Sequence, residues 1–418
     1  MYQVEASKAL LKPRTWASPA ARLSVPRNVV LLGVVSMLTD VSAEMVATIL
    51  PLYLVFSLGA SPLALGAIDG LYSGAAALVQ VGSGLVSDRW QRYKEVAGVG
   101  YGLSAACKVG LVALGSSIGA IGALVSIDRI GKGLRTAPRD ALISLSSTKA
   151  GLATAFGVHR ALDSVGAMLG PLIAFGILLL APARFDAVFV VSTLFALLGL
   201  AVLVLAVQDR PQRAPRSGSK VMRGVVRGVL RDRRFRILLL AAGGLTLASV
   251  SDALIYIGLQ RQTEFDPTVF PLLFVVTAVV FMLLAIPVGR LADRVGRVPV
   301  MLGGHAMLLP IYGFLLHSAG TFGVCLSLVA LGTYYAATEG VTTALVGAML
   351  PERSQASGIG VLVTVISLAQ LGSSLAFGAL WLAIGLHGAV LLFSIALVLF
   401  LVLATPLLMR LQREPVVE

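Results

Sequence analysis

Long apolar segments separated by short polar ones run through almost the whole chain, from Asn28 to Met409. Most of these segments hold about 20 residues or more, enough for a helix to cross a hydrocarbon core roughly 30 Å thick. Because backbone groups in lipid must bond within their own segment, we expect helices. The pattern predicts twelve membrane spans: 28–58, 62–86, 96–117, 119–141, 151–180, 186–208, 236–258, 268–288, 298–318, 320–348, 356–380 and 385–409.

A polar segment at 209–235 divides the twelve predicted spans into two sets of six. We therefore expect an all-α polytopic membrane protein, with six-helix bundles over residues 28–208 and 236–409. Residues 1–27 and 410–418 are expected to form a terminal segment and a tail outside the membrane. The composition agrees, since 57% of the residues are hydrophobic, 13% are charged and the mean hydropathy is +0.91. These values exclude an ordinary soluble domain.

The distribution of basic residues indicates how the chain crosses the membrane. If residues 1–27 are cytoplasmic, the segments on that side hold 26 Lys and Arg, counting Arg139 and Arg236 at the cytoplasmic ends of their spans, and the opposite side holds only Arg184 and Arg261. This bias predicts a multi-pass protein of the cytoplasmic membrane with both termini inside. It also accounts for the net charge of +13 without a nucleic-acid partner. We expect no cofactor and no metal site, and a monomer.

The linker 209–235 carries much of this positive charge. Its basic residues recur every three or four positions, which places them on one face of a helix: Arg216, Lys220, Arg223, Arg227, Arg231 and Arg234. One interpretation is an amphipathic helix on the anionic cytoplasmic leaflet, with membrane lipids as partners. The other is a solvated basic linker, and the pattern favours neither.

The same polar motif, Gly-x-x-x-Asp-Arg with a further basic residue, follows the second predicted span of each half. The first copy consists of Gly84, Asp88, Arg89 and Arg92, and the second of Gly289, Asp293, Arg294 and Arg297. A membrane unit that is repeated with matching charged loops is the plan of a transporter built from two repeats.

These motifs, the twelve spans and the basic central segment resemble the major facilitator superfamily over essentially the whole chain. The resemblance implies a gating role for Asp88 and Asp293, since in the family this loop latches neighbouring helices in the outward-facing state. The first copy departs from the family pattern at Gln91, where a glycine is usual.

Two further stretches carry the resemblance into the fourth and fifth spans. Arg129 with Gly133 is similar to the family's arginine motif in the fourth span. The sequence Gly166-x-x-x-Gly170-Pro171 resembles a helix-kink motif that is enriched in antiporters. Residues 39–45 and 128–140 look like one widespread bacterial branch, for which the resemblance implies no particular substrate.

Ionisable residues inside the predicted spans are the candidates for substrate and proton binding. Each costs roughly 2.5–3.5 kcal/mol at a bilayer centre, so each is expected to face a partner or a hydrated cavity. The candidates are Asp40, Glu44, Lys108, Asp128, Arg129, Lys132, Arg160, Asp163, Asp252 and Glu339. The first half balances acids with bases, whereas the second half has Asp252 and Glu339 and no base within its spans.

Helical spacing predicts partners for some of these groups. Asp40 and Glu44 share one face, Asp128 is four residues from Lys132, and Arg160 is three from Asp163. Arg129 points about 100° away from its neighbour Asp128, so we expect its counter-charge on another helix, with the first span the nearest candidate.

Lys108 has no acid nearby on its own helix. It is expected either to neutralise Asp40 or Glu44 or to contact an anionic substrate.

Glu339 and Asp252 are candidates for proton coupling. A buried carboxyl without a basic partner favours its protonated form, and proton exchange during alternating access couples transport to a proton gradient. The alternatives are a neutral, hydrogen-bonded acid or a pair with a base of the first half. We expect Glu339 to face a cavity and Asp69 to be solvated near the outer surface. For Asp252, near the outer end of its span, solvation is an alternative to a place in the cavity.

The function predicted first is secondary transport of a small organic molecule, exported in exchange for protons. The alternative is a proton-coupled symporter that imports an anionic solute, which the basic residues of the third to fifth spans would serve. The Gly-x-x-x-Gly-Pro motif favours export, and the cations favour import. An enzyme is not expected, because the sequence shows no supporting nucleophile arrangement and no phosphate-binding loop.

Overall fold

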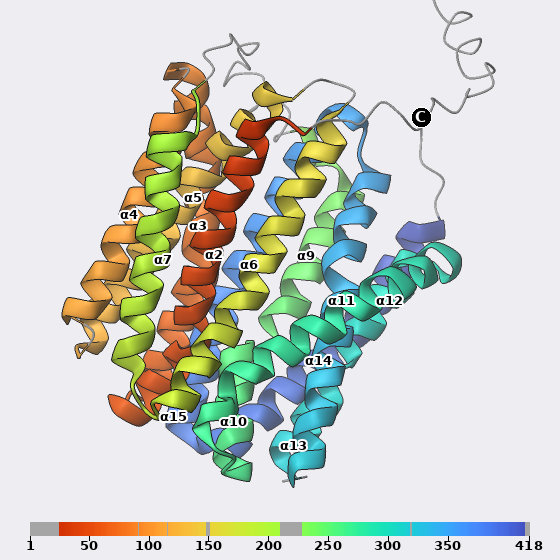
Figure 1. The fold of residues 1–418 in the computed structure, drawn as a ribbon. Coiled ribbons are helices and arrows are strands. Elements are labelled where there is room, and N and C mark those ends of the chain that lie inside the picture. The colour runs from red at the N-terminus through yellow and green to blue at the C-terminus, as the bar shows by residue number, and fades with distance from the viewer. Residues whose placement is uncertain are drawn as a thin grey trace, which may run out of the picture.

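The computed structural model describes residues 25–90, 92–114, 116–147, 151–209, 228–317 and 320–413. Within these ranges the regular structure is entirely helical, so the predicted all-α class is confirmed (Figure 1). The linker helix predicted at 209–235 falls largely on residues 210–227, which lie outside the described residues.

Six spans make up the first half of the chain, each long enough to cross a bilayer. They are α2 (Arg27–Leu52), which continues through the π-helical turn η1 (Tyr53–Ser57), α3 (Pro62–Trp90), α4 (Tyr93–Leu114), α5 (Ile118–Ser146), α6 (Leu152–Leu180) and α7 (Phe185–Ala206).

The second half is less regular, because two of its spans are divided and two others are joined. Its elements are α9 (Arg233–Leu247), α10 (Asp252–Thr263), the 3₁₀ turn η3 (Pro267–Val269), α11 (Phe270–Val295), α12 (Arg297–Ala306), α13 (Leu308–Leu316), α14 (Gly320–Met349) and α15 (Glu352–Arg413). The pairs α9–α10 and α12–α13 each form one span. The last two predicted spans are both within α15, which bends at Gly385, where φ is +79°.

Nine stretches of the described residues are apolar and long enough to span a membrane. One of them, Ser357–Arg410, has 54 residues and accommodates two crossings. The long helices α3 and α5 are not among the nine; α5 carries six charged residues between Asp128 and Asp140. This charge explains why α5 needs partners inside the protein.

The helices pack into two groups that follow the order of the chain. In the first group α2 packs against α6 and α7, and α5 packs against α3 and α4. In the second, α14 packs against α11 and α12, and α15 packs against α9. The site described below lies where the two groups meet.

Contact between the two groups is closest at the end of the bundle where α3 begins. There α3 lies so near α15 that a Cβ on Gly70 would stand 3.0 Å from the Leu371 carbonyl oxygen. Gly66 and Gly378 face backbone at similarly short range. Helix α10 contacts α2 and α3 as well, and α6 packs against α11. Because α2 crosses the bundle once before α3 begins, this closed end lies opposite Arg27.

Candidate functional site

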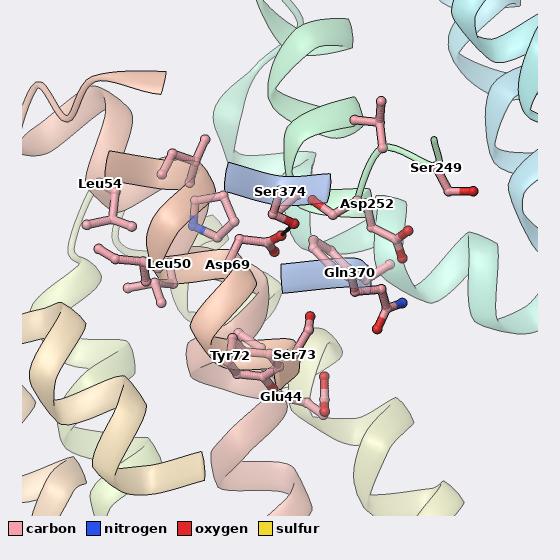
Figure 2. Close-up of a pocket in the computed structure, with 18 of the residues that line it drawn as sticks. Glu44, Leu50, Leu54, Asp69, Tyr72, Ser73, Ser249, Asp252, Gln370 and Ser374 are labelled. Carbon is pink, nitrogen blue, oxygen red and sulfur yellow. Dashed lines mark hydrogen bonds between the residues drawn. The ribbon is translucent and has the colours of Figure 1, made fainter. Parts of the chain in front are cut away.

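Two adjoining pockets lie between the two groups of helices. Their volumes are about 260 and 270 Å³, and both are lined by Glu44, Asp252, Phe274 and Tyr335. We treat them as one space, the central cavity. Figure 2 shows the first pocket, where Glu44, Asp69 and Asp252 come from three different helices around it.

Glu44 reaches the cavity from α2, and its position depends on close packing with α6. A Cβ on Gly170 would lie 2.7 Å from the Cβ of Glu44 and 2.8 Å from the carbonyl oxygen of Val41. Any side chain at position 170 would therefore push α2 and α6 apart. Pro171 follows Gly170 and lines the cavity. The Gly-x-x-x-Gly-Pro motif thus forms a close helix contact that places Glu44.

Asp252 owes its position to the break between α9 and α10. The Tyr312 hydroxyl accepts a hydrogen bond from the Val250 N–H (2.8 Å) and donates one to the Ala248 carbonyl (3.0 Å). These bonds satisfy backbone groups that the interrupted helix leaves unpaired. Asp252 then begins α10 inside the cavity, where the Tyr335 hydroxyl donates to its carboxylate at 2.6 Å. Of the two alternatives for Asp252, a place in the cavity and solvation near the outer surface, the lining of both pockets agrees with the first.

Asp69 is a cavity residue that sequence reasoning placed among solvated positions, and this is corrected. The Ser374 hydroxyl of α15 donates to the Asp69 carboxylate at 2.7 Å (Figure 2). Asp69 therefore joins the two halves within the contact of α3 with α15. Its place between Gly66 and Gly70 was the available signal, because closely packed glycines mark a helix face that meets another helix.

Glu339 projects from α14 into the second pocket, one turn after Tyr335. The side chain is exposed to the cavity, and Arg160 of α6 is the base that acts on it electrostatically. The local pair predicted between Arg160 and Asp163 is wrong. Among the described contacts Asp163 instead accepts a hydrogen bond from Ser36 at 2.7 Å and faces Asp40.

A buried ion cluster holds α4 and α5 together. Asp128 accepts from Arg129 at 2.6 Å and lies 3.5 Å from the Lys108 ammonium, and all three residues are buried. Three predictions are corrected here, because Asp128 does not pair with Lys132, Arg129 pairs with its own neighbour, and Lys108 pairs with neither Asp40 nor Glu44. The long Arg129 side chain folds back along α5, and its guanidinium also stacks 4.0 Å from the Tyr72 ring centroid.

Asp40 and Lys132 belong to a second charged group between α2 and α5. The Asp40 carboxylate lies 4.0 Å from the Arg135 guanidinium, and Lys132 acts electrostatically on both Asp40 and Glu44. Lys132 of α5 therefore lies near Asp40 and Glu44, the two carboxyls that share one face of α2. Its positive charge reduces their mutual repulsion.

The comparison with known families agrees with this geometry. The family model described as Major Facilitator Superfamily matches residues 32–259 and 246–418, which is nearly the whole chain. The chain belongs to the major facilitator superfamily. It is therefore a multi-pass membrane protein and a secondary transporter, not an enzyme.

Proteins with low sequence identity to this superfamily member still share its fold. It is 31% identical over 366 residues to an uncharacterized MFS-type transporter of Methanocaldococcus jannaschii, covering 85% of this chain and 88% of that protein. A mutant of the nucleoside transporter NupG matches with a TM-score of 0.79 at 14% identity, over 91% of this chain and 99% of that one. A bacterial homolog of the lysosomal transporter Spinster, described as inward-facing and unoccupied, matches with a TM-score of 0.70 at 14% identity, over 93% and 98% of the two chains.

The structure describes the side chains of the second copy of the superfamily's loop motif, at 289–297. Arg297 lies 3.6 Å from Asp293 and donates to the Ala344 carbonyl of α14 at 2.8 Å, while Arg294 is exposed. Gly296, at φ +109°, makes the turn from α11 to α12, a conformation that favours glycine. The side chains of Asp88 and Arg89 lie outside the described residues, and Arg92 forms an exposed pair with Glu95 at 3.0 Å.

The chemistry available in the central cavity is that of carboxyls and aromatic rings. Among the described residues no group of three His, Cys, Asp or Glu side chains is arranged to hold a metal ion. The four carboxyls of the lining, Glu44, Asp69, Asp252 and Glu339, come from both halves. Such an arrangement is suited to binding protons or a positively charged solute.

Proposed function

We propose that this transporter exports a small organic molecule across the cytoplasmic membrane in exchange for protons. The observation that carries the proposal is the presence of Asp252 and Glu339, the two acids of the second half, in a cavity shared with the first half. Carboxyls placed at the interface between the halves can be exposed to either side in turn, which is what proton coupling by alternating access requires.

The direction in which the cavity opens follows from the orientation of the chain. With both termini cytoplasmic, as the 26 basic residues on that side indicate, the closed end formed by α3 and α15 faces outward. We assign this arrangement to the inward-facing state, because the end that faces outward is the closed one. In this state the solute enters from the cytoplasm and displaces protons from the cavity carboxyls.

The return to the outward-facing state requires the halves, residues 28–208 and 236–409, to rock as units. We assign Asp88 and Asp293 to gates on the cytoplasmic side, with Arg297 holding the α11–α12 turn against α14 in the inward-facing state. When protons load from outside, Asp252 and Glu339 become neutral. The protein, loaded with protons and free of solute, then returns to the inward-facing state without moving these negative charges across the membrane. Moving each charge across 100 mV would involve about 2.3 kcal/mol.

Import of an anionic solute is the weaker proposal. It depended on the cations of the third to fifth spans, but Lys108 and Arg129 are buried against Asp128 and are absent from the described lining of the cavity. Arg160, the base nearest Glu339, is already opposed by a carboxylate.

A comparison of two transport modes tests the coupling assignment. Glu339→Gln in proteoliposomes is expected to retain exchange of labelled for unlabelled solute but to lose accumulation driven by a pH gradient. Glu264→Gln, an exposed acid at the end of α10, serves as the matched control. Accumulation at the normal rate in Glu339→Gln would remove Glu339 from the coupling mechanism.

A further inference from the structure

Building on the proposed export function, we propose that the solute is an organic cation with an aromatic or apolar body, held in the central cavity with Asp252 as its anchor. The argument depends on three features of the cavity: the sign of its charges, the partners of each carboxyl, and its rings.

The charged residues in the described lining of the central cavity are all acids. Four carboxyls line the two pockets, and none of the other lining residues is Lys or Arg. Two cations lie next to the lining, Lys132 near Glu44 and Arg160 near Glu339, and each acts on one of its carboxyls. Three others are buried outside the lining. Lys108, Arg129 and Arg135 are 4%, 2% and 3% exposed, and each contacts an acid of its own half. The charged side chains that line this space are therefore all acids, which repel an anion and attract a cation.

The four carboxyls differ in whether the protein already supplies a nearby positive charge or a hydrogen-bond donor to each of them. Glu44 has Lys132 and Arg129 near it, Glu339 has Arg160, and Asp69 accepts a hydrogen bond from Ser374.

Asp252 is the exception. It accepts from the Tyr335 hydroxyl, and the charged groups that act on it most strongly are the acids Asp69 and Glu339. A buried carboxylate among acids is stabilised by a bound cation. Asp252 also lines both pockets, so a ligand on either side reaches it.

The rings of the cavity suit the rest of such a molecule. Phe274 and Tyr335 line both pockets, Tyr334 lines the first, and Tyr256 and Phe281 line the second. The ring planes of Tyr256 and Phe274 are inclined at 80° and their centroids lie 4.8 Å apart, so the edge of one ring meets the face of the other. Aromatic faces attract ammonium groups and also bury an apolar body. With pocket volumes of 260 and 270 Å³, a one- or two-ring amine is the size that fits.

Isothermal titration of the purified full-length protein tests the charge preference directly. The probes are benzyltrimethylammonium and phenylmethanesulfonate, which share an aromatic body and carry opposite charges. We expect the cation to bind and the sulfonate to bind at least about tenfold more weakly, the value of one charge-assisted contact. Equal or tighter binding of the sulfonate, or no binding of the cation, would overturn the proposal.

Variants locate the anchor. Asp252→Asn is expected to weaken cation binding by about tenfold or more, and Phe274→Leu by a few-fold through loss of a ring. Asp266→Asn, an exposed residue before η3, is expected to leave binding unchanged. Melting curves verify folding, and if Asp252→Asn does not fold, Phe274→Leu carries the test. Unchanged affinity in a folded Asp252→Asn, or in Phe274→Leu, would contradict the assignment.

The titration also separates this inference from the proposed function, because binding is measured without a pH gradient. Cation binding without proton exchange would contradict antiport alone. Proton exchange with a solute that is not a cation would contradict the cation proposal alone.

Discussion

Asp128 is the counter-ion of two buried cations, and this was not predictable from helical spacing. The spacing rule compares the directions of Cα–Cβ bonds, which separates Arg129 from Asp128. The guanidinium, however, ends a long flexible side chain, and burial favours the nearest carboxylate whatever its direction. The sequence therefore identified which residues need partners inside the membrane but not which partner each one has.

Asp128→Asn is expected to destabilise the protein strongly. The change leaves Lys108 and Arg129 buried without a counter-charge, which typically costs about 3–5 kcal/mol. The readout is a large fall in the melting temperature of the purified protein. Asp186→Asn, which alters an exposed pair with Arg184, is expected to shift it far less. Equal shifts in the two variants would contradict a structural role for the cluster.

At the scale of elements, the lengths of the spans were predictable and the break between α9 and α10 was not. Residues 248–251, Ala-Ser-Val-Ser, contain neither Gly nor Pro, so no local signal marks the interruption. The break is stabilised from a distance, by the Tyr312 hydroxyl and by Ser373, which donates to the Ser249 carbonyl. Such contacts depend on how spans far apart in sequence pack.

Tyr312→Phe tests how the break is held. Removing the hydroxyl leaves the Val250 N–H and the Ala248 carbonyl without this partner, a loss of about 1–3 kcal/mol. We expect a lower melting temperature and weaker cation binding, because Asp252 directly follows the break. The control is Tyr101→Phe, since the Tyr101 hydroxyl is buried without a hydrogen-bond partner among the described residues. An unchanged Tyr312→Phe protein would show that the break needs no such support.

At the scale of the molecule, the all-α class and membership of the superfamily were predictable from repeated motifs and hydropathy. The contacts between the two halves were not predictable, because residues as distant in sequence as Asp69 and Ser374 come together only when both halves are folded. Asp69 was misplaced for this reason. The charge pattern identified the cavity acids Glu44, Asp252 and Glu339 as candidates, because ionisable residues within long apolar segments can be found in a sequence.

A disulfide across the closed end tests alternating access. Asp69→Cys with Ser374→Cys, in a background with Cys107→Ser and Cys325→Ser, joins side chains whose oxygens lie 2.7 Å apart. We expect oxidation to link α3 to α15 and to stop the transport that the reduced double variant retains, until a reductant is added. The single-cysteine variants control for oxidation itself. Continued transport by the linked protein would show that this end does not open.

The most direct test of the whole account is the direction in which lumenal pH changes when a bound cation enters proteoliposomes. Benzyltrimethylammonium suits this measurement because it has no titratable proton, and the membrane potential is clamped with valinomycin and potassium. Antiport predicts that adding the cation outside raises the pH inside, and that Glu339→Gln abolishes the change. A fall in lumenal pH, or entry of the cation with no pH change, would contradict proton-coupled export.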